Sequence, residues 1–333
     1  MQELKLWKFI LEKFAEEVPV ALLCVLESKG SSPGRQGFKM AVEETGMTGS
    51  IGGGIMEHKL VETAREILHK ERTDSIIKEQ FHNKSAGHRN QSGMICSGEQ
   101  TVFIYPVKEN DIVQIQNLIS SLEADKNGTL KISPEGIIFS DLIPQENYFF
   151  QMNGENDFEF IEKTGFKNHL FIIGGGHCSL AFSKMMSEMD FHIHLYEDRP
   201  YLFTFLQNEF VREKKVMDDY SLLKNIIPDG ESHYVVIMTF GYRTDKIALL
   251  ALIEKNFKYF GVLGSKSKIE KMFDELQVEG ISESQLKKIN APVGINIKSE
   301  TPEEIAVSIA AEIIKVKNAI ATDSQVAAGN EKK

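Results

Sequence analysis

The chain has 333 residues, enough for about two domains of roughly 150 residues each. Hydrophobic residues make up 42% and charged residues 26%, so the composition supplies full hydrophobic cores and excludes a largely disordered chain. With 38 basic and 48 acidic residues the formal charge is −10, which argues against a surface that follows nucleic-acid phosphates.

Membrane and disulfide signals are both weak. The longest apolar run, 18–26, contains Pro19 and is about half as long as a membrane span. The acidic residues of the first segment do not fit a secretory signal. The three cysteines, Cys24, Cys96 and Cys178, are far apart and form no CxxC pair, so neither a disulfide framework nor a zinc finger is indicated. We expect a cytoplasmic protein without a membrane span.

The first half of the chain mixes helical and strand periodicity. Apolar spacings of three and four predict helices over 4–17, 55–70 and 112–122, and short apolar runs predict strands over 20–27, 38–42, 75–81 and 99–105. The polar stretch 82–97 is expected to be a loop. Asn, Gly, Asp and Pro interrupt 124–167, so we interpret 108–167 as a connecting region.

From residue 168 the pattern changes to strands that alternate with helices. The expected strands are 169–173, 191–196, 234–238 and 259–263, and the expected helices are 180–189, 201–208, 244–255, 269–276 and 302–319. This alternation predicts parallel βαβ units with right-handed crossovers. Residues 322–333 are typical of a frayed tail.

A glycine-rich turn follows the first of these strands. In a dinucleotide-binding fold, Gly174 would allow the tight turn and Gly176 would let backbone amides approach a pyrophosphate at the helix start. The third position of the pattern is Ser179 rather than glycine. Glu197 follows Gly174 by 23 residues, about where a carboxylate would bind a ribose hydroxyl, whereas Arg199 would favour a phosphate. The pattern therefore predicts nucleotide binding without choosing between NAD and NADP.

Two more positions belong to the same predicted crevice. His177 opens the helix, where its ring would either bind a phosphate or cap backbone amides. At the end of a later strand, Gly264, Ser265 and Lys266 suit an anionic ligand, although a helix cap with a solvated lysine has the same pattern. Cys178 is expected to pack inward. His192 and His194 lie on a strand with no carboxylate or thiol at ligand spacing, so we assign no metal site.

Two glycine-rich segments near the N-terminus are candidates for anion binding. Consecutive amides at a helix start form an anion nest, and an arginine adds a planar charge that fits phosphate. Tight turns with purely conformational glycines would give the same pattern. The candidate residues are Gly30, Ser31, Ser32, Arg35, Gly52, Gly53, Gly54 and Glu57. Cys96, in a glycine-flanked loop, is either a reactive or sulfur-carrying thiol or an inert one, and residue chemistry alone favours the inert reading.

Six sequence segments, taken together in their order along the chain, are more specific than any single glycine motif. They read GSSPGRQGFKM, GSIGGGIMEHKLVETA, SGMICSGEQTVFIYPV, FIIGGGHCSLAFSKMM with LYEDRP, YFGVLGSKSKIEKMF, and APVGINIKSETPEEIAVSIAAEI. Together they resemble the XdhC/CoxI family of xanthine dehydrogenase accessory proteins over most of the chain outside 108–167. Two positions depart from the family pattern: Cys-Gly-Gly reads Cys96-Ser97-Gly98, and Thr-His reads Thr239-Phe240.

The resemblance implies an α/β fold with two parts. A Rossmann-like doubly wound parallel sheet would occupy 168–320, and a smaller α+β domain of the XdhC type would occupy 1–107, with 108–167 between them and a flexible tail at 321–333. The family's N-terminal glycine motif falls on 30–35 and 52–57, its cysteine motif on Cys96, and its dinucleotide-fold turn on 174–177.

The resemblance also implies a function. The chain would bind the molybdenum cofactor, as molybdopterin or its dinucleotide form, protect it while a cysteine desulfurase supplies sulfur, and assist its insertion into a xanthine dehydrogenase-type enzyme. No acid–base pair stands out, so we assign no catalytic residue and expect a maturation factor that forms a homodimer. The alternatives are an NAD(P)-dependent oxidoreductase and a nucleotide-sensing regulator that uses the Rossmann-like domain.

Overall fold

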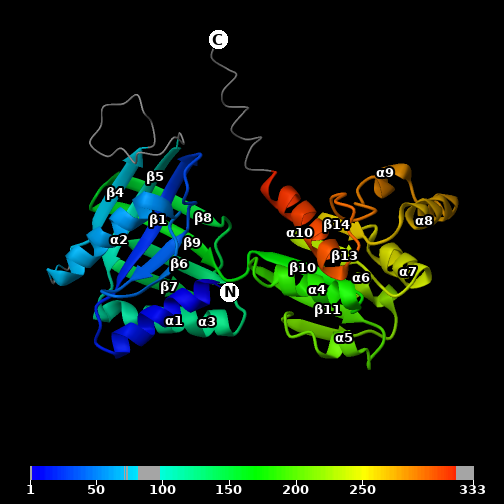
Figure 1. Cartoon of the computed structure of the whole chain (residues 1–333), viewed down its shortest axis with the longest axis horizontal. Coiled ribbons are helices and arrows are strands. Elements are labelled where there is room, and N and C mark those ends of the chain that lie inside the picture. The colour runs from blue at the N-terminus through cyan, green and yellow to red at the C-terminus, as the bar shows by residue number, and fades with distance from the viewer. Residues whose placement is uncertain (1, 71, 73, 82–97, 320–333) are drawn as a thin grey trace, which may run out of the picture. The chain divides into compact units, whose positions relative to one another are not determined.

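The computed structural model describes residues 2–70, 72, 74–81 and 98–319. It divides into two compact units, Met1–Phe166 and Lys167–Lys333 (Figure 1). The division falls one residue from the expected start of the second domain. Among the described residues, no helix has the length and apolar character needed to cross a membrane.

Unit 1 is built on two antiparallel sheets. The five-stranded sheet has the order β3-β2-β1-β5-β4, and the four-stranded sheet has the order β7-β6-β9-β8. The first contains β1 (Ala21–Gly30), β2 (Lys39–Val42), β3 (Met47–Gly49), β4 (Ile76–Phe81) and β5 (Gly98–Pro106), and the second contains β6 (Gly128–Ser133), β7 (Gly136–Ser140), β8 (Tyr148–Gly154) and β9 (Asp157–Thr164). The helices are α1 (Gln2–Ala15), α2 (Gly54–His69) and α3 (Ile112–Glu123).

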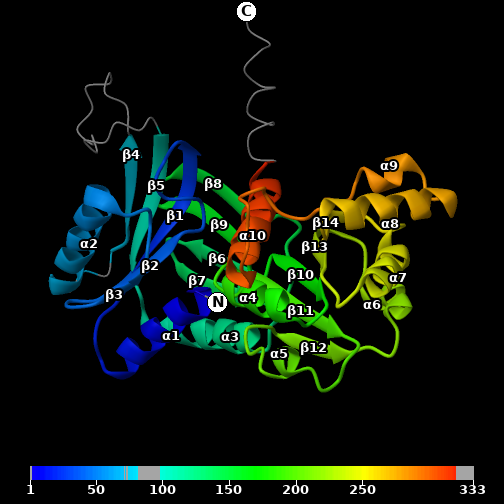
Figure 2. The same ribbon diagram turned by 45° about the vertical axis from the view of Figure 1, so that its right-hand side comes forward.

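The central strand β1 is buried on both faces, which explains its uninterrupted apolar sequence. Leu23 and Val25 pack with the apolar side of α2. Leu22 and Cys24 face the opposite way, into a core that contains residues of α1, α3 and the four-stranded sheet. The five-stranded sheet therefore lies between α2 on one side and these elements on the other, as Figure 2 shows.

The segment 108–167 is not a connecting region. Leu118 of α3, Ile132 of β6 and Phe160 of β9 are buried in the same core as Trp7 of α1. Lys39 of β2 also forms an ion pair with Glu162 of β9, and both side chains are buried. The sequence did not reveal this sheet because Asn, Gly, Asp and Pro residues interrupt the segment 124–167. The strands pair with one another within the same segment.

Unit 2 contains a five-stranded parallel sheet in the order β12-β11-β10-β13-β14. In chain order its strands are β10 (Asn168–Ile173), β11 (Phe191–Glu197), β12 (Glu213–Val216), β13 (Gly230–Ile237) and β14 (Phe257–Val262). The chain moves outward from β10 to β12, then returns to the other side of β10 with β13. This confirms the doubly wound Rossmann-like fold, whose strand order reverses between β10 and β13.

Helices cover both faces of this sheet. Leu170 and Ile172 of β10 pack with α4 (His177–Met186) and α10 (Pro302–Asn318), whereas Phe171 and Ile173 face α6 (Leu223–Ile226), α7 (Tyr242–Leu252) and α8 (Lys266–Val278). Two short helices, α5 (Phe203–Leu206) and α9 (Glu283–Leu286), complete the unit. Alternate residues of one strand thus belong to different cores, as expected for a sheet covered on both faces.

Candidate functional site

The turn after β10 brings the ends of two strands into close contact. Gly174 has a φ of 108° and donates a backbone hydrogen bond to the carbonyl of Tyr196 at 2.7 Å. A Cβ at Gly174 would lie 2.3 Å from the carbonyl oxygen of Met238, the residue after β13. Glycine is therefore required twice here, for its backbone angle and for the close approach of β13.

Glu197 does not face outward. Its side chain is fully buried, and Oε2 accepts a hydrogen bond from the backbone N–H of Gly175 at 2.5 Å. Arg199 donates to the same carboxylate, with Nε 2.6 Å from Oε1 and Nη2 3.1 Å from Oε2. The expected ribose contact of Glu197 is thus replaced by contacts within the protein. The Glu197 carboxylate instead stabilises the glycine turn through its hydrogen bond with Gly175.

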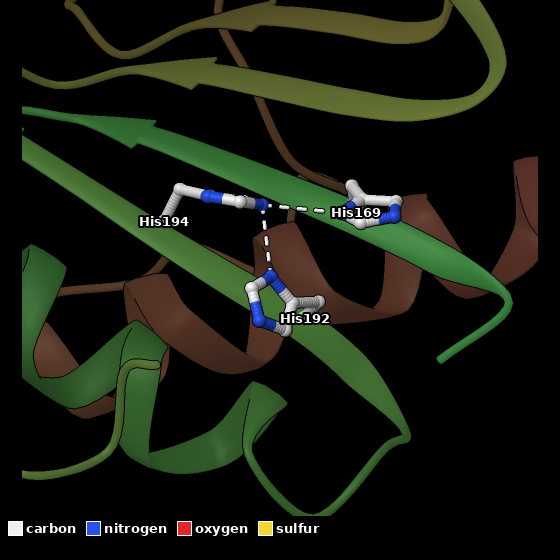
Figure 3. Close-up of side chains that lie close together, drawn as sticks. All are labelled: His169, His192 and His194. Atoms are coloured by element: carbon white, nitrogen blue, oxygen red, sulfur yellow. Dashed lines mark hydrogen bonds between the residues drawn. The ribbon is translucent and has the colours of Figure 1, made fainter. Parts of the chain in front are cut away.

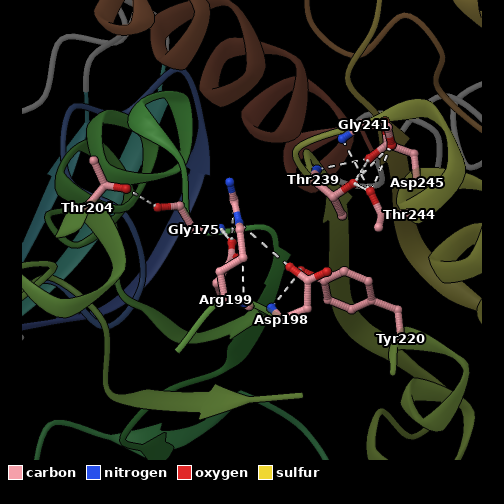
Figure 4. Close-up of polar contacts among 10 residues, drawn as sticks. Gly175, Asp198, Arg199, Thr204, Tyr220, Thr239, Gly241, Thr244 and Asp245 are labelled. Atoms are coloured by element: carbon pink, nitrogen blue, oxygen red, sulfur yellow. Dashed lines mark hydrogen bonds and ion pairs between the residues drawn. The ribbon is translucent and has the colours of Figure 1, made fainter. Parts of the chain in front are cut away.

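Two adjacent acids have opposite pKa shifts. Burial opposes ionisation of Glu197, but the hydrogen bonds from Arg199 and Gly175 hold its pKa below the usual value. Burial and the neighbouring Glu197 raise the pKa of Asp198. The hydroxyl of Tyr220 lies 3.3 Å from Oδ1 of Asp198 and accepts a hydrogen bond from the Asp198 backbone (Figure 4). Arg199 is close to both acids, since its Nε also lies 3.7 Å from Oδ1 of Asp198.

A pocket of about 370 Å³ opens beside this turn. Its walls come from the segments that follow β10, β11 and β13, at the reversal of strand order where ligands bind in open parallel sheets. The lining residues are Gly176, His177, Arg199, Leu202, Phe203, Thr204, Met238, Thr239 and Phe240. The sequence placed Gly176 and His177 at this crevice, and the structure brings both to its wall.

Cationic and aromatic groups meet on the pocket wall. The Arg199 guanidinium lies 5.0 Å from the centre of the Phe240 ring, and Phe240 is 83% exposed. Gly176 lines the same pocket and caps α4, and a Cβ there would have no atom within 4 Å. The helix N-terminus contributes partial positive charge and N–H donors to this open space. The pocket therefore suits a ligand with an anionic group and a flat ring.

The buried carboxylate of Asp245 holds the loop that follows β13. Asp245 accepts hydrogen bonds from the backbone N–H of Thr239 at 2.9 Å and from its hydroxyl at 2.6 Å (Figure 4). Lys268 pairs with the other oxygen of Asp245. Thr204, which also lines the pocket, holds the glycine turn, since its hydroxyl donates to the carbonyl of Gly175 at 2.5 Å. The polar groups on both sides are thus held by their own partners.

The second expected part of the crevice is a helix cap. The Ser265 hydroxyl accepts a hydrogen bond from the backbone of Lys268 at 3.3 Å. Lys266 is exposed and lies 3.8 Å from Glu270 on the same helix. Gly264 packs beside the stem of Lys268. None of the three lines the pocket. The cation directed toward the loop after β13 is Lys268, which no motif in the sequence singles out.

In unit 1, the nest before α2 contains a carboxylate of the chain itself. Oε2 of Glu57 accepts hydrogen bonds from the Ser50 hydroxyl at 2.7 Å and from the backbone of Ile51 and Gly53 at 2.9 Å each. Burial opposes ionisation of Glu57, yet these hydrogen bonds hold its pKa below the usual value. Glu57 thus takes the place of an external anion at these donors, rather than helping to bind one.

The remaining N-terminal candidates form a tight junction of loops. A Cβ at Gly52 would lie 2.4 Å from the backbone nitrogen of Gly34, and a Cβ at Gly98 would lie 2.5 Å from that of Ser32. Ser32 is buried and donates to the Gly34 carbonyl at 2.6 Å. These contacts bring the two glycine-rich segments together, as well as the start of β5.

The outer positions of this junction are more open. Gly30 ends β1, and its carbonyl accepts a hydrogen bond from the exposed Arg35 at 3.2 Å. Ser31 is exposed beside it. A Cβ at Gly53 or Gly54 would have no atom within 4 Å. Cys96 lies outside the described residues.

Two family models match the chain. One, the XdhC Rossmann domain, covers residues 170–313, and the other, the XdhC and CoxI family, covers residues 14–78. The chain belongs to the XdhC and CoxI family. The matched regions contain the glycine turn and pocket of this XdhC/CoxI protein, together with both N-terminal glycine segments.

Curated relatives and a solved structure agree with this assignment. The XdhC/CoxI protein is 27% identical to the uncharacterized protein YqeB of Escherichia coli strain K12 over 314 residues, or 91% of this chain and 44% of that protein. It is 24% identical to a probable xanthine dehydrogenase subunit of Bacillus subtilis strain 168 over 165 residues, or 49% of this chain and 47% of that protein. The matches thus span less than half the length of these relatives.

The crystal structure of a xanthine dehydrogenase from Bacillus halodurans has the same fold. The TM-score is 0.68, at 22% sequence identity, and the match covers 94% of this chain and 96% of that chain. The similarity therefore includes both units of the XdhC/CoxI protein.

Sequence reasoning missed the residues that set the shape of the pocket. Phe240 stands out in the sequence only because it replaces a histidine of the family pattern, and Asp245 falls inside a predicted helix. An acidic residue in the first turn of a helix, just after a strand, is a usable signal because its side chain can reach the amides at the strand end. Cys178, in the first turn of α4, packs against the core as expected, and burial raises its pKa.

Proposed function

We propose that this protein binds the molybdenum cofactor in the crevice of unit 2, as molybdopterin or its dinucleotide form. It protects the cofactor while a cysteine desulfurase supplies sulfur, and it assists insertion into a xanthine dehydrogenase-type enzyme in the cytoplasm. The observation that carries the proposal is the pocket in which Arg199, Phe240 and the N-terminus of α4 meet. Family membership and the name of the Bacillus subtilis relative support the choice of client.

The residues of the pocket fit the parts of this cofactor. The exposed Phe240 ring offers a face for a planar pterin, and Arg199 and the amides near Gly176 offer donors for a phosphate. When bound, the cofactor supplies the molybdenum centre used by the client enzyme. The protein's own residues bind and orient it, and the apolar side chains of Leu202 and Met238 limit the access of water.

The crevice is a better phosphate site than the nest in unit 1. Glu57 already accepts hydrogen bonds from Ile51 and Gly53, so an anion would have to displace a carboxylate that is held in its ionised form. Arg35 is turned back to the carbonyl of Gly30. No such displacement is needed at Gly176, where the space beside the backbone is open.

The test compares two exposed aromatic residues on the same unit. Purified full-length protein is mixed with molybdopterin, and retention is followed through gel filtration by pterin fluorescence. Phe240→Ala should weaken binding by roughly 5- to 150-fold. This range corresponds to the loss of about 1–3 kcal/mol, the usual contribution of an aromatic side chain stacked on a base. Tyr201→Ala is the matched control, because Tyr201 is 90% exposed but does not line the pocket. Equal retention by both variants, or none by the wild type, would contradict the proposal.

The elution volume of the wild-type protein in the same gel-filtration experiment tests whether it is a homodimer.

A second candidate is binding of NAD(P) or another nucleotide, for oxidoreduction or for sensing. The doubly wound strand order favours it, since this sheet commonly binds dinucleotides at the reversal between β10 and β13. The internal bonding of Glu197 counts against the usual ribose contact. Retention of NAD(H) or ATP, with no retention of molybdopterin, would favour this candidate.

A further inference from the structure

Three histidines meet on one face of the parallel sheet, toward the ends of the strands that lie away from the crevice. His169 is the second residue of β10, and His192 and His194 lie on β11. Each offers a ring nitrogen, and the three nitrogens lie within 4.8 Å of one another. His192 and His194 are buried, whereas His169 is half-buried.

Strand register explains why the rings converge. His169 pairs directly with His192 in the parallel ladder, so their side chains leave the sheet on the same face. His194 follows His192 by two residues and therefore also points to that face. Spacing along the sequence shows no third ligand beside His192 and His194. The missing ligand comes from the neighbouring strand.

One ring nitrogen receives two close contacts. Nε2 of His194 lies 3.1 Å from Nδ1 of His169 and 3.0 Å from Nδ1 of His192. Figure 3 shows both contacts ending on this atom. A neutral imidazole nitrogen has a single lone pair, so it cannot accept two well-directed hydrogen bonds at once. Hydrogen bonds alone therefore satisfy the two contacts at His194 Nε2 poorly.

The other nitrogen of His194 fixes which atom carries the lone pair. Nδ1 lies 3.1 Å from Oε2 of Glu213 on β12, the strand next to β11. A carboxylate holds the proton on the nitrogen that faces it, which leaves the lone pair on Nε2. A metal-binding histidine usually has this kind of partner, because it sets the ring's orientation and raises its basicity.

We propose that His169 Nδ1, His192 Nδ1 and His194 Nε2 bind a divalent transition-metal ion of the zinc class, with Glu213 as the partner that orients His194. Imidazole ligands suit zinc and its neighbours, and three protein ligands leave a fourth position open. Nitrogens about 2.0–2.1 Å from a tetrahedral zinc ion lie roughly 3.3 Å apart. The two contacts at His194 need only a small outward movement to reach this spacing. The site is separate from the proposed cofactor crevice.

The experiment measures binding of zinc alone to full-length protein that has been stripped with a chelator. Equilibrium dialysis and metal analysis should find one zinc ion per chain. His169→Asn and His194→Gln should each lose this ion, and Glu213→Ala should weaken binding by roughly 10- to 100-fold. His233→Asn is the matched control, because its ring lies 5.4 Å from that of His169 but does not belong to the three-nitrogen cluster. It should retain one zinc ion per chain.

A second measurement guards against variants that fail to fold. Cobalt(II) bound to the wild type should give the visible absorption of a four-coordinate site, and zinc should remove it by competition. His169 lies near the start of its strand and is half-buried, so His169→Asn should keep the wild-type circular dichroism. Substoichiometric zinc in the wild type, or one zinc ion retained by folded His169→Asn, would overturn the proposal. Neither result depends on whether the crevice binds molybdopterin.

Discussion

Glu197 Oε2 lies 2.5 Å from the backbone nitrogen of Gly175, so the carboxylate accepts a hydrogen bond from the glycine turn. A dinucleotide pattern would direct Glu197 toward a ligand, whereas Gly175 occupies a position of the pattern that does not specify the residue. Here they satisfy each other, and Arg199 completes the carboxylate's hydrogen bonds while it extends along the pocket wall. The turn is therefore set in its shape before any ligand arrives.

Glu197→Ala should lower the free energy of unfolding of the protein by about 2–3 kcal/mol. The variant leaves the Gly175 amide without its charged acceptor, and hydrogen bonds to charged groups are worth about 1.5–3 kcal/mol each. Urea denaturation followed by circular dichroism measures the loss. The exposed Glu188→Ala is the control and should change stability by less than about 0.5 kcal/mol. Equal effects would show that the bond to Gly175 contributes little.

Glu57 predicts an acid-sensitive contribution to stability. Its folded-state pKa is below the usual 4.5, so the unfolded chain binds its proton first as the pH falls. The stabilisation is complete above about pH 4.5 and is lost as the pH falls through the folded-state pKa. Glu57→Gln should therefore reduce stability at pH 7 by about 1–2 kcal/mol and flatten its decline below pH 4.5.

The control for Glu57 is on the same helix. Glu66 is exposed and lies 3.5 Å from Lys70, so Glu66→Gln should leave both stability and its pH profile nearly unchanged. Urea midpoints between pH 3 and pH 7 provide the comparison. A wild-type pH profile in Glu57→Gln would mean that the carboxylate is not held by the nest.

Lys39 and Glu162 should show strong coupling in a double-mutant cycle. Each single change, Lys39→Met or Glu162→Leu, leaves one charge buried without its main partner and should cost about 3–5 kcal/mol. The double variant should cost much less than the sum of the two, because apolar side chains of similar size fill the same space. Additive losses in urea denaturation would show that the pair is not a unit.

Two lysines on α8 should behave differently although they are two residues apart. Lys268→Ala should cost about 2–3 kcal/mol, because it leaves the buried Asp245 without its cation. Lys266→Ala should cost less than about 0.5 kcal/mol, because Lys266 is exposed and its partner Glu270 is too. Thermal denaturation of both variants tests this contrast. The reverse order would mean that Lys266 faces the site after all.

Much of the fold follows from local patterns in the sequence. The apolar runs at β10 and β11 and the helical spacing of α10 are periodic signals, which depend on neighbours a few residues away. Gly174 was predictable because a tight turn between strand and helix restricts the residue type. The four-stranded sheet was missed because Asn, Gly, Asp and Pro residues interrupt 124–167, and because pairing between strands is not a local property.

The candidate site was predictable in its position but not in its bonding. The sequence placed a crevice after β10, since ligands in parallel sheets lie beyond the carboxyl ends of the strands. It assigned Glu197 and Glu57 to ligands, whereas each binds backbone amides of this chain. A residue type shows that a carboxylate is present, but the packing around it decides which donors it reaches.

By itself, the sequence determined most of the alternating strands and helices of unit 2, the glycine turn and the family. Only the tertiary structure decided which charged and ring groups meet. Lys268 reaches Asp245 while Lys266 points to solvent, because positions two apart on a helix differ by about 200°. His169 meets His192 because the register of two parallel strands, separated by a helix in the chain, places them side by side. Such contacts arise from the packing of distant segments, which local periodicity does not encode.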